Sequence, residues 1–134
     1  MILLDSTVIV GVLDTDDALH EVAVARFKEV VANHTLAASV ISYGEVMTGV
    51  SLGHHPRERV EGFFDTFVKD LLPVDKPVAA RGATLRGERK ALSMPDALIL
   101  ATADLNEEIE MALCADKEWP KVKRLSCRVE MLKA

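Results

Sequence analysis

Residues 1–13 read MILLDSTVIVGVL, and this segment indicates how the chain folds. The first four residues form an apolar run that is too short for a helix and that predicts a buried strand. Asp5 ends the run, and Ser6 and Thr7 then open a second apolar stretch that continues through Leu13. The polar turn that begins at Asp14 closes this stretch.

Short apolar runs alternate with helical patterns along the rest of the chain. Further strands are expected at residues 36–38, 71–74, 109–115 and 122–126. Helices are expected at residues 19–32, 39–52, about 60–67, 77–91 and from Ser93 onward. Strands that alternate with helices predict a mostly parallel sheet covered on both faces. Because there is no repeat or linker, we expect residues 1–134 to form a single α/β domain.

The composition is that of a small protein with an aliphatic core. A chain of 134 residues buries roughly two-thirds of its unfolded surface, and only 4% of its residues are aromatic. Cys114 and Cys127 lack zinc-binding spacing and are too few for a disulfide framework, so we expect both to be reduced and buried. No apolar stretch approaches the roughly 18 residues of a membrane span, which predicts a soluble, cytoplasmic protein without a membrane partner.

The net charge of −5 bears directly on possible partners. Nucleic-acid binding depends on neutralising phosphates, so an acidic chain argues against such a partner unless cations fill an acidic pocket and basic residues surround it. The candidate basic residues are Arg81, Arg86, Arg89, Lys90, Lys117, Lys121, Lys123 and Arg124. For each of them a solvated position is the default interpretation, and a phosphate contact is the alternative.

Four acidic residues are placed where the predicted sheet would bring them together. Asp5 ends the first strand, and Asp116 follows the strand that ends near Cys114. Asp96 lies in the first turn of the apolar helix after Ser93, and Glu45 lies one or two turns into the helix that follows the second strand. Ligands of open parallel sheets bind beyond the carboxyl ends of the strands, so all four acids can reach one edge.

Each acid also has a purely structural interpretation. Asp5 could cap the helix that follows it, and Glu45 could form a capping box with Ser42. Asp96 could interact with the dipole of its own helix, and Asp116 could be a turn residue. Individually, therefore, none of the four residues is decisive.

Taken together, the four acids indicate a metal site. Several carboxylates at one edge of a sheet repel one another unless a cation or a proton neutralises them. Mg²⁺ and Mn²⁺ prefer such oxygen ligands, and the neighbouring hydroxyls of Ser6 and Thr7 could support the ligands. A divalent ion lowers the pKa of its water and stabilises charge on phosphoryl oxygens, which is the chemistry of phosphodiester cleavage.

Four segments carry a resemblance to a known family. They are LLDSTVIV (3–10), AASVISYGEVMTG (37–49), LSMPDALILATA (92–103) and LCADKEW (113–119). In this order and spacing they resemble the PIN domain, and more narrowly the VapC-type ribonuclease toxins of type II toxin–antitoxin pairs. The resemblance extends from residue 2 to about residue 126.

The resemblance implies a fold, an activity and a set of site residues. The implied fold is a three-layer α/β/α sandwich around a parallel sheet, and the implied activity is hydrolysis of single-stranded RNA with one or two Mg²⁺ or Mn²⁺ ions. The family's four acids fall on Asp5, Glu45, Asp96 and Asp116, and its hydroxyl falls on Ser6 and Thr7. The resemblance further implies a homodimer and a cognate antitoxin that blocks the groove.

The sequence departs from the family pattern at two positions. Cys114 stands where many members have Thr or Ser, two residues before the fourth acid, so both a direct and a water-mediated role of Asp116 stay open. Trp119 stands where Phe is common after that acid. We expect Trp119 to pack in the interior, with base stacking as the alternative.

Two other functional classes are alternatives to the nuclease. A phosphoreceiver-type signalling domain is also α/β, but it needs a pair of acids after the first strand, and Asp75 is the only candidate phosphoacceptor here. A PIN-like RNA- or protein-binding module without catalysis is the second alternative. The net negative charge and Cys114 leave room for this module.

Overall fold

The computed structural model describes residues 1–133, and its elements alternate between strand and helix as the sequence predicts. The strands are β1 (Ile2–Leu4), β2 (Leu36–Ser39), β3 (Val68–Leu72), β4 (Met111–Cys114) and β5 (Arg128–Met131). The helices are α1 (Ser6–Leu13), α2 (His20–Asn33), α3 (Val40–Ser51), α4 (Arg57–Phe67), α5 (Lys76–Glu88) and α6 (Met94–Asp104), with a 3₁₀ turn η1 (Trp119–Lys121).

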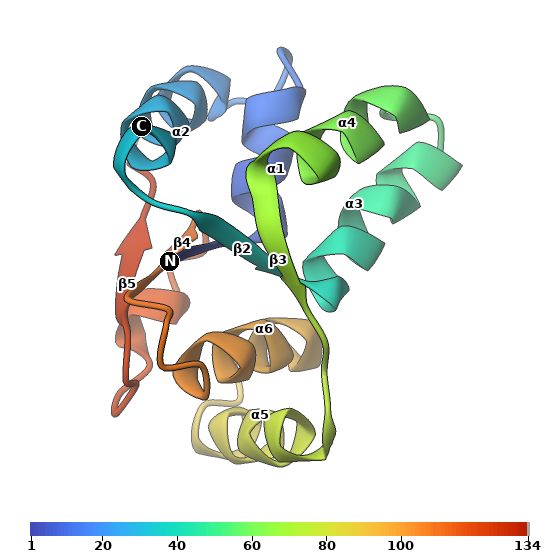
Figure 1. Cartoon of the computed structure of the whole chain (residues 1–134). Helices are drawn as coiled ribbons and strands as arrows, with labels where there is room; N and C mark the ends of the chain where they lie inside the picture. The colour runs from blue at the N-terminus through green and yellow to red at the C-terminus, as the bar shows by residue number, and fades with distance from the viewer. Residues whose placement is uncertain (134) are drawn as a thin grey trace.

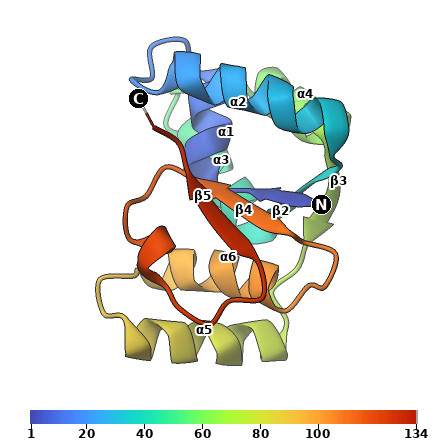
Figure 2. The ribbon, with the colours of Figure 1, turned by 90° about the vertical axis from the view of Figure 1, so that its left-hand side faces the viewer.

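The five strands form one sheet in the order β3-β2-β1-β4-β5, and every neighbouring pair is parallel. Helices α1, α2, α3 and α4 lie on one side of the sheet, and α5 and α6 lie on the other (Figures 1 and 2). The predicted three-layer α/β/α sandwich with a parallel sheet is therefore confirmed. The sheet is in fact entirely parallel.

Two hydrophobic clusters fill the space between the layers. Ile2 and Leu4 of β1 belong to the cluster beneath α1 to α4, whereas Leu3 belongs to the cluster beneath α5 and α6. The same alternation holds in β4, where Leu113 faces the first cluster and Ala112 the second. Successive side chains of a strand point to opposite faces, so a central strand covered on both sides must be apolar at every position.

Two helices begin at the serines that the sequence indicated. The Ser39 hydroxyl accepts a hydrogen bond from the backbone N–H of Ile41 (3.0 Å), and the Ser93 hydroxyl accepts one from Asp96 (3.3 Å). Each bond satisfies one of the N–H groups that a helix start leaves without a partner. These caps fix where α3 and α6 start and hence where Glu45 and Asp96 lie.

The strand expected at residues 122–126 is wrong. This segment is a loop, in which Arg124 adopts a left-handed backbone conformation (φ 61°) that no strand tolerates. The fifth strand instead covers Arg128–Met131 and pairs with β4. Arg128 and Glu130 interrupt the apolar pattern of this strand, because an edge strand needs only partial burial.

The third strand lies three residues earlier than expected, at Val68–Leu72 rather than 71–74. Its residues alternate between half-buried and exposed because β3 is the other edge of the sheet. The expected helix 77–91 is also shorter, since α5 ends at Glu88. In both cases the element exists and only its bounds were wrong.

Both cysteines, Cys114 and Cys127, are free thiols in the interior, as expected. Trp119 is fully buried, which confirms its packing role and excludes base stacking by this side chain. Among the helices of residues 1–133, none has the length and apolar character needed to cross a membrane.

Candidate metal centre

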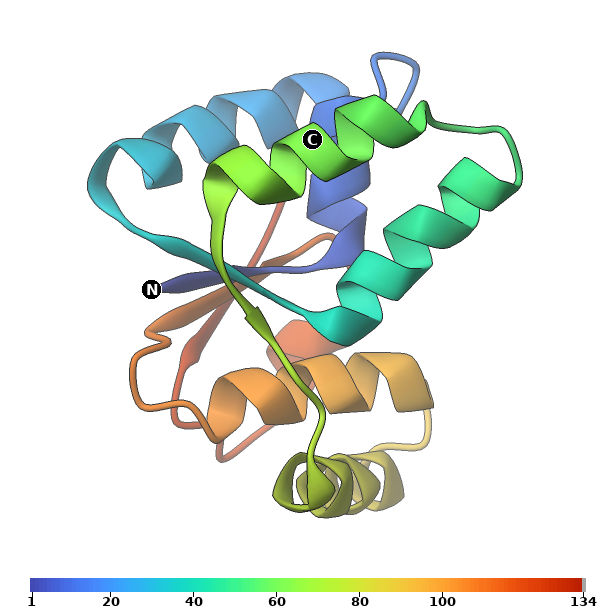
Figure 3. The same cartoon turned by 45° about the vertical axis from the view of Figure 1, so that its right-hand side comes forward.

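The strand order brings the four predicted acids to the same end of the central strands. Asp5 directly follows β1, and Asp116 lies two residues beyond β4, which is hydrogen-bonded to β1. Helices α1 and α3 start at the edge where β1 and β2 end, and α6 starts on the same side (Figure 3). Glu45 and Asp96 are therefore carried by helices that begin at this edge.

Asp5 is the most buried acid of this group, with only 1% of its surface exposed. It occupies the N-cap position of α1 but makes no side-chain capping bond, so the simple capping interpretation is wrong. The Thr7 hydroxyl donates a hydrogen bond to Asp5 Oδ2 (2.7 Å) and accepts one from the backbone N–H of Ala115 (3.2 Å). The other oxygen, Asp5 Oδ1, is buried and has no hydrogen-bond partner within residues 1–133.

The environment of Asp5 disfavours its charged form. The pKa of Asp5 is raised to about 7, mainly by burial and also by the charges of Asp96 and Glu45, although the hydrogen bond from Thr7 lowers it. A buried carboxylate with a free oxygen costs free energy unless a proton or a cation occupies that position. A proton or a cation next to Asp5 would therefore offset this cost.

Glu45 faces Asp5 from helix α3. The Ser6 hydroxyl donates a hydrogen bond to Glu45 Oε1 (3.0 Å), so two consecutive hydroxyls each contact a different acid. Burial and then the charge of Asp96 raise the pKa of Glu45, while the Ser6 bond lowers it. The suggested capping box with Ser42 is wrong, because α3 begins after Ser39.

Asp96 and Asp116 form the other half of the group. Burial is the main cause that raises the pKa of Asp96, and the charge of Asp116 adds to it. The indole of Trp119 lowers the pKa of Asp96, although the buried Trp119 Nε1 has no hydrogen-bond partner within residues 1–133. Asp116 Oδ1 accepts a hydrogen bond from the backbone N–H of Glu118 (2.8 Å), so Asp116 is partly engaged in its own turn.

Cys114 replaces a hydroxyl but still contributes to the geometry of the site. Its thiol donates to the backbone carbonyl of Asp116 (3.5 Å), and burial raises the pKa of this thiol to about 12. At neutral pH it is therefore an uncharged thiol that fixes the turn rather than a thiolate ligand. Neither this contact nor the Trp119–Asp96 proximity had a signal in the sequence, since both depend on how the β4–η1 turn folds back.

The chemistry of these groups fits a hard divalent cation. All four side chains offer carboxylate oxygens, and one buried oxygen of Asp5 has no partner within residues 1–133. The negative charges of Asp5, Glu45 and Asp96 repel one another. Mg²⁺ and Mn²⁺ select such ligands and keep several waters. The side chains are not closed around an ion: within residues 1–133, no three Asp, Glu, His or Cys residues form a compact metal cluster.

A cavity of about 370 Å³ opens beside these acids. Ser6, Thr7 and Glu45 line it together with the apolar side chains of Val10 and Leu19. The acids are therefore reached through an opening on the α1 side that has a partly apolar wall.

Asp75, the phosphoacceptor candidate of the receiver alternative, lies elsewhere in a structural role. Its carboxylate accepts a hydrogen bond from the backbone N–H of Val78 (3.0 Å) and caps α5. Asp5 is the single acid at the end of β1, so the acid pair of a receiver is missing. The receiver interpretation is wrong.

The sequence matches the family model of the PIN domain over residues 2–125, so this chain belongs to the PIN domain family. The match includes all four predicted acids, and the sheet order and helix layers described above agree with it.

Several solved structures have a similar fold. A toxin–antitoxin complex from Klebsiella pneumoniae contains a chain 25% identical, with a TM-score of 0.78 and coverage of 99% of this chain and 98% of that one. FitAcB from Neisseria gonorrhoeae is also 25% identical, with a TM-score of 0.72 and 96% of each chain covered. VapC20 of Mycobacterium tuberculosis, a sarcin-ricin loop cleaving toxin, is 17% identical, with a TM-score of 0.75 over 96% of this chain and 99% of that one. No curated protein sequence matches the chain.

Proposed function

We propose that this chain is a metal-dependent endoribonuclease and the toxin of a toxin–antitoxin pair. The observation that carries the proposal is the buried oxygen Oδ1 of Asp5, which has no hydrogen-bond partner within residues 1–133. Burial and the neighbouring acids raise the pKa of this carboxyl. Membership of the PIN family and the likeness to chains of toxin–antitoxin complexes support it.

In this proposal the cation is Mg²⁺ or Mn²⁺, held by Asp5, Glu45 and Asp96. When bound, a divalent ion supplies an activated water and neutralises charge on the phosphoryl oxygens. Asp116 contributes directly or through water, since one of its oxygens already accepts the Glu118 N–H. The expected products carry a 5′-phosphate and a 3′-hydroxyl.

The chain's own residues prepare this site in three ways. Thr7 holds Asp5 through Oδ2 and leaves Oδ1 available, and Ser6 holds Glu45 through Oε1. Trp119 favours the charged form of Asp96. Hydrogen bonds around metal ligands orient them before the ion binds, which explains why such a site can be ready without being closed.

The decisive experiment compares Glu45→Gln with Glu107→Gln, which removes the same charge from an exposed residue without a side-chain partner in residues 1–133. Both variants are assayed with single-stranded RNA in Mn²⁺, and in a chelator, after their thermal unfolding has been checked. We expect Glu45→Gln to abolish Mn²⁺-dependent cleavage and Glu107→Gln to retain it. Undiminished cleavage by folded Glu45→Gln would contradict the mechanism.

A catalytically inactive PIN-like binding module is the second candidate. The observation that favours it is that no three Asp, Glu, His or Cys residues within 1–133 form a compact metal cluster. Calorimetric titration with Mn²⁺ separates the two candidates. Saturable binding that Glu45→Gln weakens supports the nuclease, and no binding at all supports the module.

The proposed partners are single-stranded RNA, a second copy of this chain and a cognate antitoxin protein. Support for the antitoxin comes from the likeness to a chain of the toxin–antitoxin complex from Klebsiella pneumoniae. Light scattering of the purified chain tests the homodimer. A small DNA-binding protein encoded next to this chain would be the antitoxin candidate, and its co-purification with the chain tests the pair.

A further inference from the structure

A basic cavity lies on a different part of the molecule from the candidate metal centre. It has a volume of about 320 Å³ and is formed by the C-terminal end of α5 and the segment after η1. Its lining residues are Leu85, Glu88, Arg89, Lys121, Val122, Lys123 and Arg124. Four of its five charged residues are basic, in a chain whose net charge is −5. Positive charge is therefore concentrated here against the overall balance.

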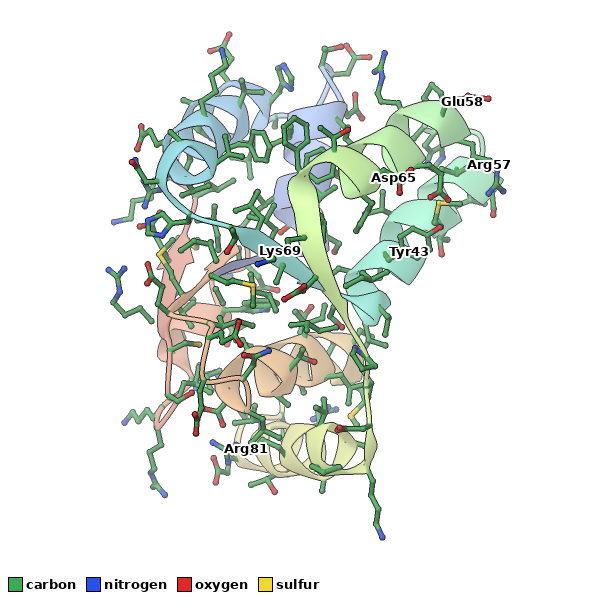
Figure 4. The ribbon with its side chains drawn as sticks, in the orientation of Figure 1. Tyr43, Arg57, Glu58, Asp65, Lys69 and Arg81 are labelled. Carbon is green, nitrogen blue, oxygen red and sulfur yellow. The ribbon has the colours of Figure 1, made fainter. Side chains whose placement is uncertain are left out.

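The segment that carries three of these cations is held in place by polar contacts with α5 and with the end of α6. Arg81 of α5, labelled in Figure 4, pairs with Asp104 (2.8 Å) and donates to the backbone carbonyl of Arg124 (3.3 Å). Asp104 also accepts the backbone N–H of Ser126 (2.7 Å). Arg81 thus acts as a brace that links α5 to the loop that carries Lys123 and Arg124.

The cations of the cavity divide into two kinds. Arg89 and Lys121 both contact Glu118, at 3.0 and 3.5 Å, and Arg89 is the main cause that lowers the pKa of Glu118. Lys123 and Arg124 are exposed, and their side chains make no ion pair or hydrogen bond within residues 1–133. Glu118 therefore holds Arg89 in place, whereas Lys121 contacts it only at 3.5 Å with 52% of its side chain exposed, so Lys121, Lys123 and Arg124 are available to a ligand.

The cavity is connected to the candidate metal centre through a short, hydrogen-bonded stretch of backbone. The backbone N–H of Glu118 donates to Asp116 Oδ1 (2.8 Å), and the backbone N–H of Trp119 donates to the backbone carbonyl of Asp116 (3.3 Å). The same Glu118 binds Arg89 and Lys121 through its side chain. One turn thus joins the fourth acid to the basic cavity, as expected if both contact a single extended ligand.

We infer that this cavity is a phosphate-binding subsite for single-stranded RNA, in which Lys121, Lys123 and Arg124 contact backbone phosphates outside the position of cleavage. The inference rests on the proposed function, because it assigns this surface to the same substrate. A chain with net negative charge needs a local set of cations to hold a polyanion. Phosphate contacts of this kind position the strand and do not read its sequence.

The test measures RNA binding without cleavage. A fluorescein-labelled single-stranded RNA is titrated in chelator, by anisotropy, at several salt concentrations. Lys121→Gln with Lys123→Gln is compared with Lys28→Gln plus Lys69→Gln, two exposed lysines on α2 and β3 (Lys69 is labelled in Figure 4). Both double variants remove two charges, and only the first pair lines the cavity. Lys123→Gln alone serves as a milder variant, since this lysine has no side-chain partner in residues 1–133.

We expect the cavity variant to bind about tenfold more weakly near physiological salt, with a salt slope smaller by about 1.4, or about 0.7 for Lys123→Gln alone. The control pair should bind like the unmodified chain. Equal losses in both pairs would mean that only net charge matters, and this would overturn the subsite. Unchanged RNA binding with lost binding of polyglutamate would overturn it in favour of an acidic protein segment.

This outcome is separable from that of the proposed function. If the chain binds RNA through the cavity but never cleaves it, the subsite stands and the nuclease fails. If the chain cleaves RNA and the cavity variant binds and cleaves like the unmodified protein, the nuclease stands and the subsite fails.

Discussion

The Thr7 hydroxyl donates to Asp5 Oδ2 at 2.7 Å while Oδ1 of the same carboxylate stays buried without a partner in residues 1–133. One oxygen is thus fixed by the protein and the other is left for a cation or a proton. The same hydroxyl accepts the Ala115 N–H, so Thr7 also joins the start of α1 to the end of β4. This single side chain sets the position of the most buried acid in the candidate site.

The first prediction concerns Thr7→Val, which keeps the shape of the side chain and removes the hydroxyl. Because the lost hydrogen bond lowers the pKa of Asp5, the variant should raise this pKa and weaken Mn²⁺ binding by about 10- to 100-fold. Its free energy of unfolding should also be lower by about 1–3 kcal/mol, since Asp5 and Ala115 both lose a hydrogen-bond partner. Titration calorimetry and urea unfolding measure the two effects. Thr7→Ser keeps the hydroxyl and should leave Mn²⁺ binding and stability close to those of the parent chain. A Thr7→Val variant that binds Mn²⁺ normally would refute the role of Thr7.

The second prediction is that Asp5→Asn stabilises the metal-free protein at neutral pH while abolishing metal-dependent cleavage. Asn has nearly the same shape as Asp and carries no charge. The carboxyl that it replaces is buried, and its pKa is raised from 3.8 to about 7. A shift of this size corresponds to as much as about 4 kcal/mol. Urea unfolding at pH 7 in chelator checks the sign. A variant less stable than the parent chain would show that the charge is already compensated.

The pH dependence of the metal-free chain follows from the same group. The folded pKa of Asp5 lies above its unfolded value, so the folded state holds a proton that the unfolded state has lost. The contribution of Asp5 to stability is thus fully present below about pH 4 and is lost as the pH rises through about 7. Glu45 and Asp96, whose pKa values are also raised, act in the same direction. In the Asp5→Asn variant this loss should be smaller, and excess Mg²⁺ should reverse it in the parent chain.

The central part of the fold could be predicted because its strands are buried on both faces. β1 and β4 read as uninterrupted apolar runs, and β2 reads as an apolar run that ends at the capping Ser39, because strands buried on both faces favour apolar residues. β3 and β5 are the edge strands and contain charged residues such as Lys69 and Glu130. An edge strand meets the core on part of its surface only, so its sequence is ambiguous and its bounds were misjudged.

The candidate site divides in the same way. Asp5, Glu45, Asp96 and Asp116 could be predicted to lie at one edge because strand ends and serine caps place them there. The contacts that tune them could not be predicted, since they join residues far apart in the sequence. Thr7 with Ala115 and Trp119 with Asp96 depend on the register of β1 against β4 and on the path of the turn after β4.

The fourth prediction tests the brace beneath the basic cavity. Asp104 accepts hydrogen bonds from Arg81 and from the backbone of Ser126, and its side chain is only 10% exposed. Removing it by Asp104→Ala should cost about 2–3 kcal/mol, because the Arg81 charge loses its partner in a partly buried position. Glu107→Ala, on the exposed loop that follows, should change stability by less than about 0.5 kcal/mol. Urea unfolding of the two variants gives the comparison, and similar values would show that Asp104 is not a brace.

The last prediction concerns Arg124, the only residue other than glycine in 1–133 with a positive φ (61°). A side chain in the left-handed region costs roughly 1 kcal/mol, which glycine does not pay. Arg124→Gly should therefore raise the free energy of unfolding by about 0.5–1 kcal/mol, and it should reduce the salt slope of RNA binding by about 0.7. The stability of Arg124→Asn should lie between those of the parent chain and Arg124→Gly, since Asn tolerates this backbone conformation. Its RNA binding should match that of Arg124→Gly, since neither residue carries a charge. Gain of stability together with loss of binding would mean that the arginine serves the ligand at the expense of the fold. A variant that loses stability would instead show that the arginine side chain packs against the loop and contributes to the fold.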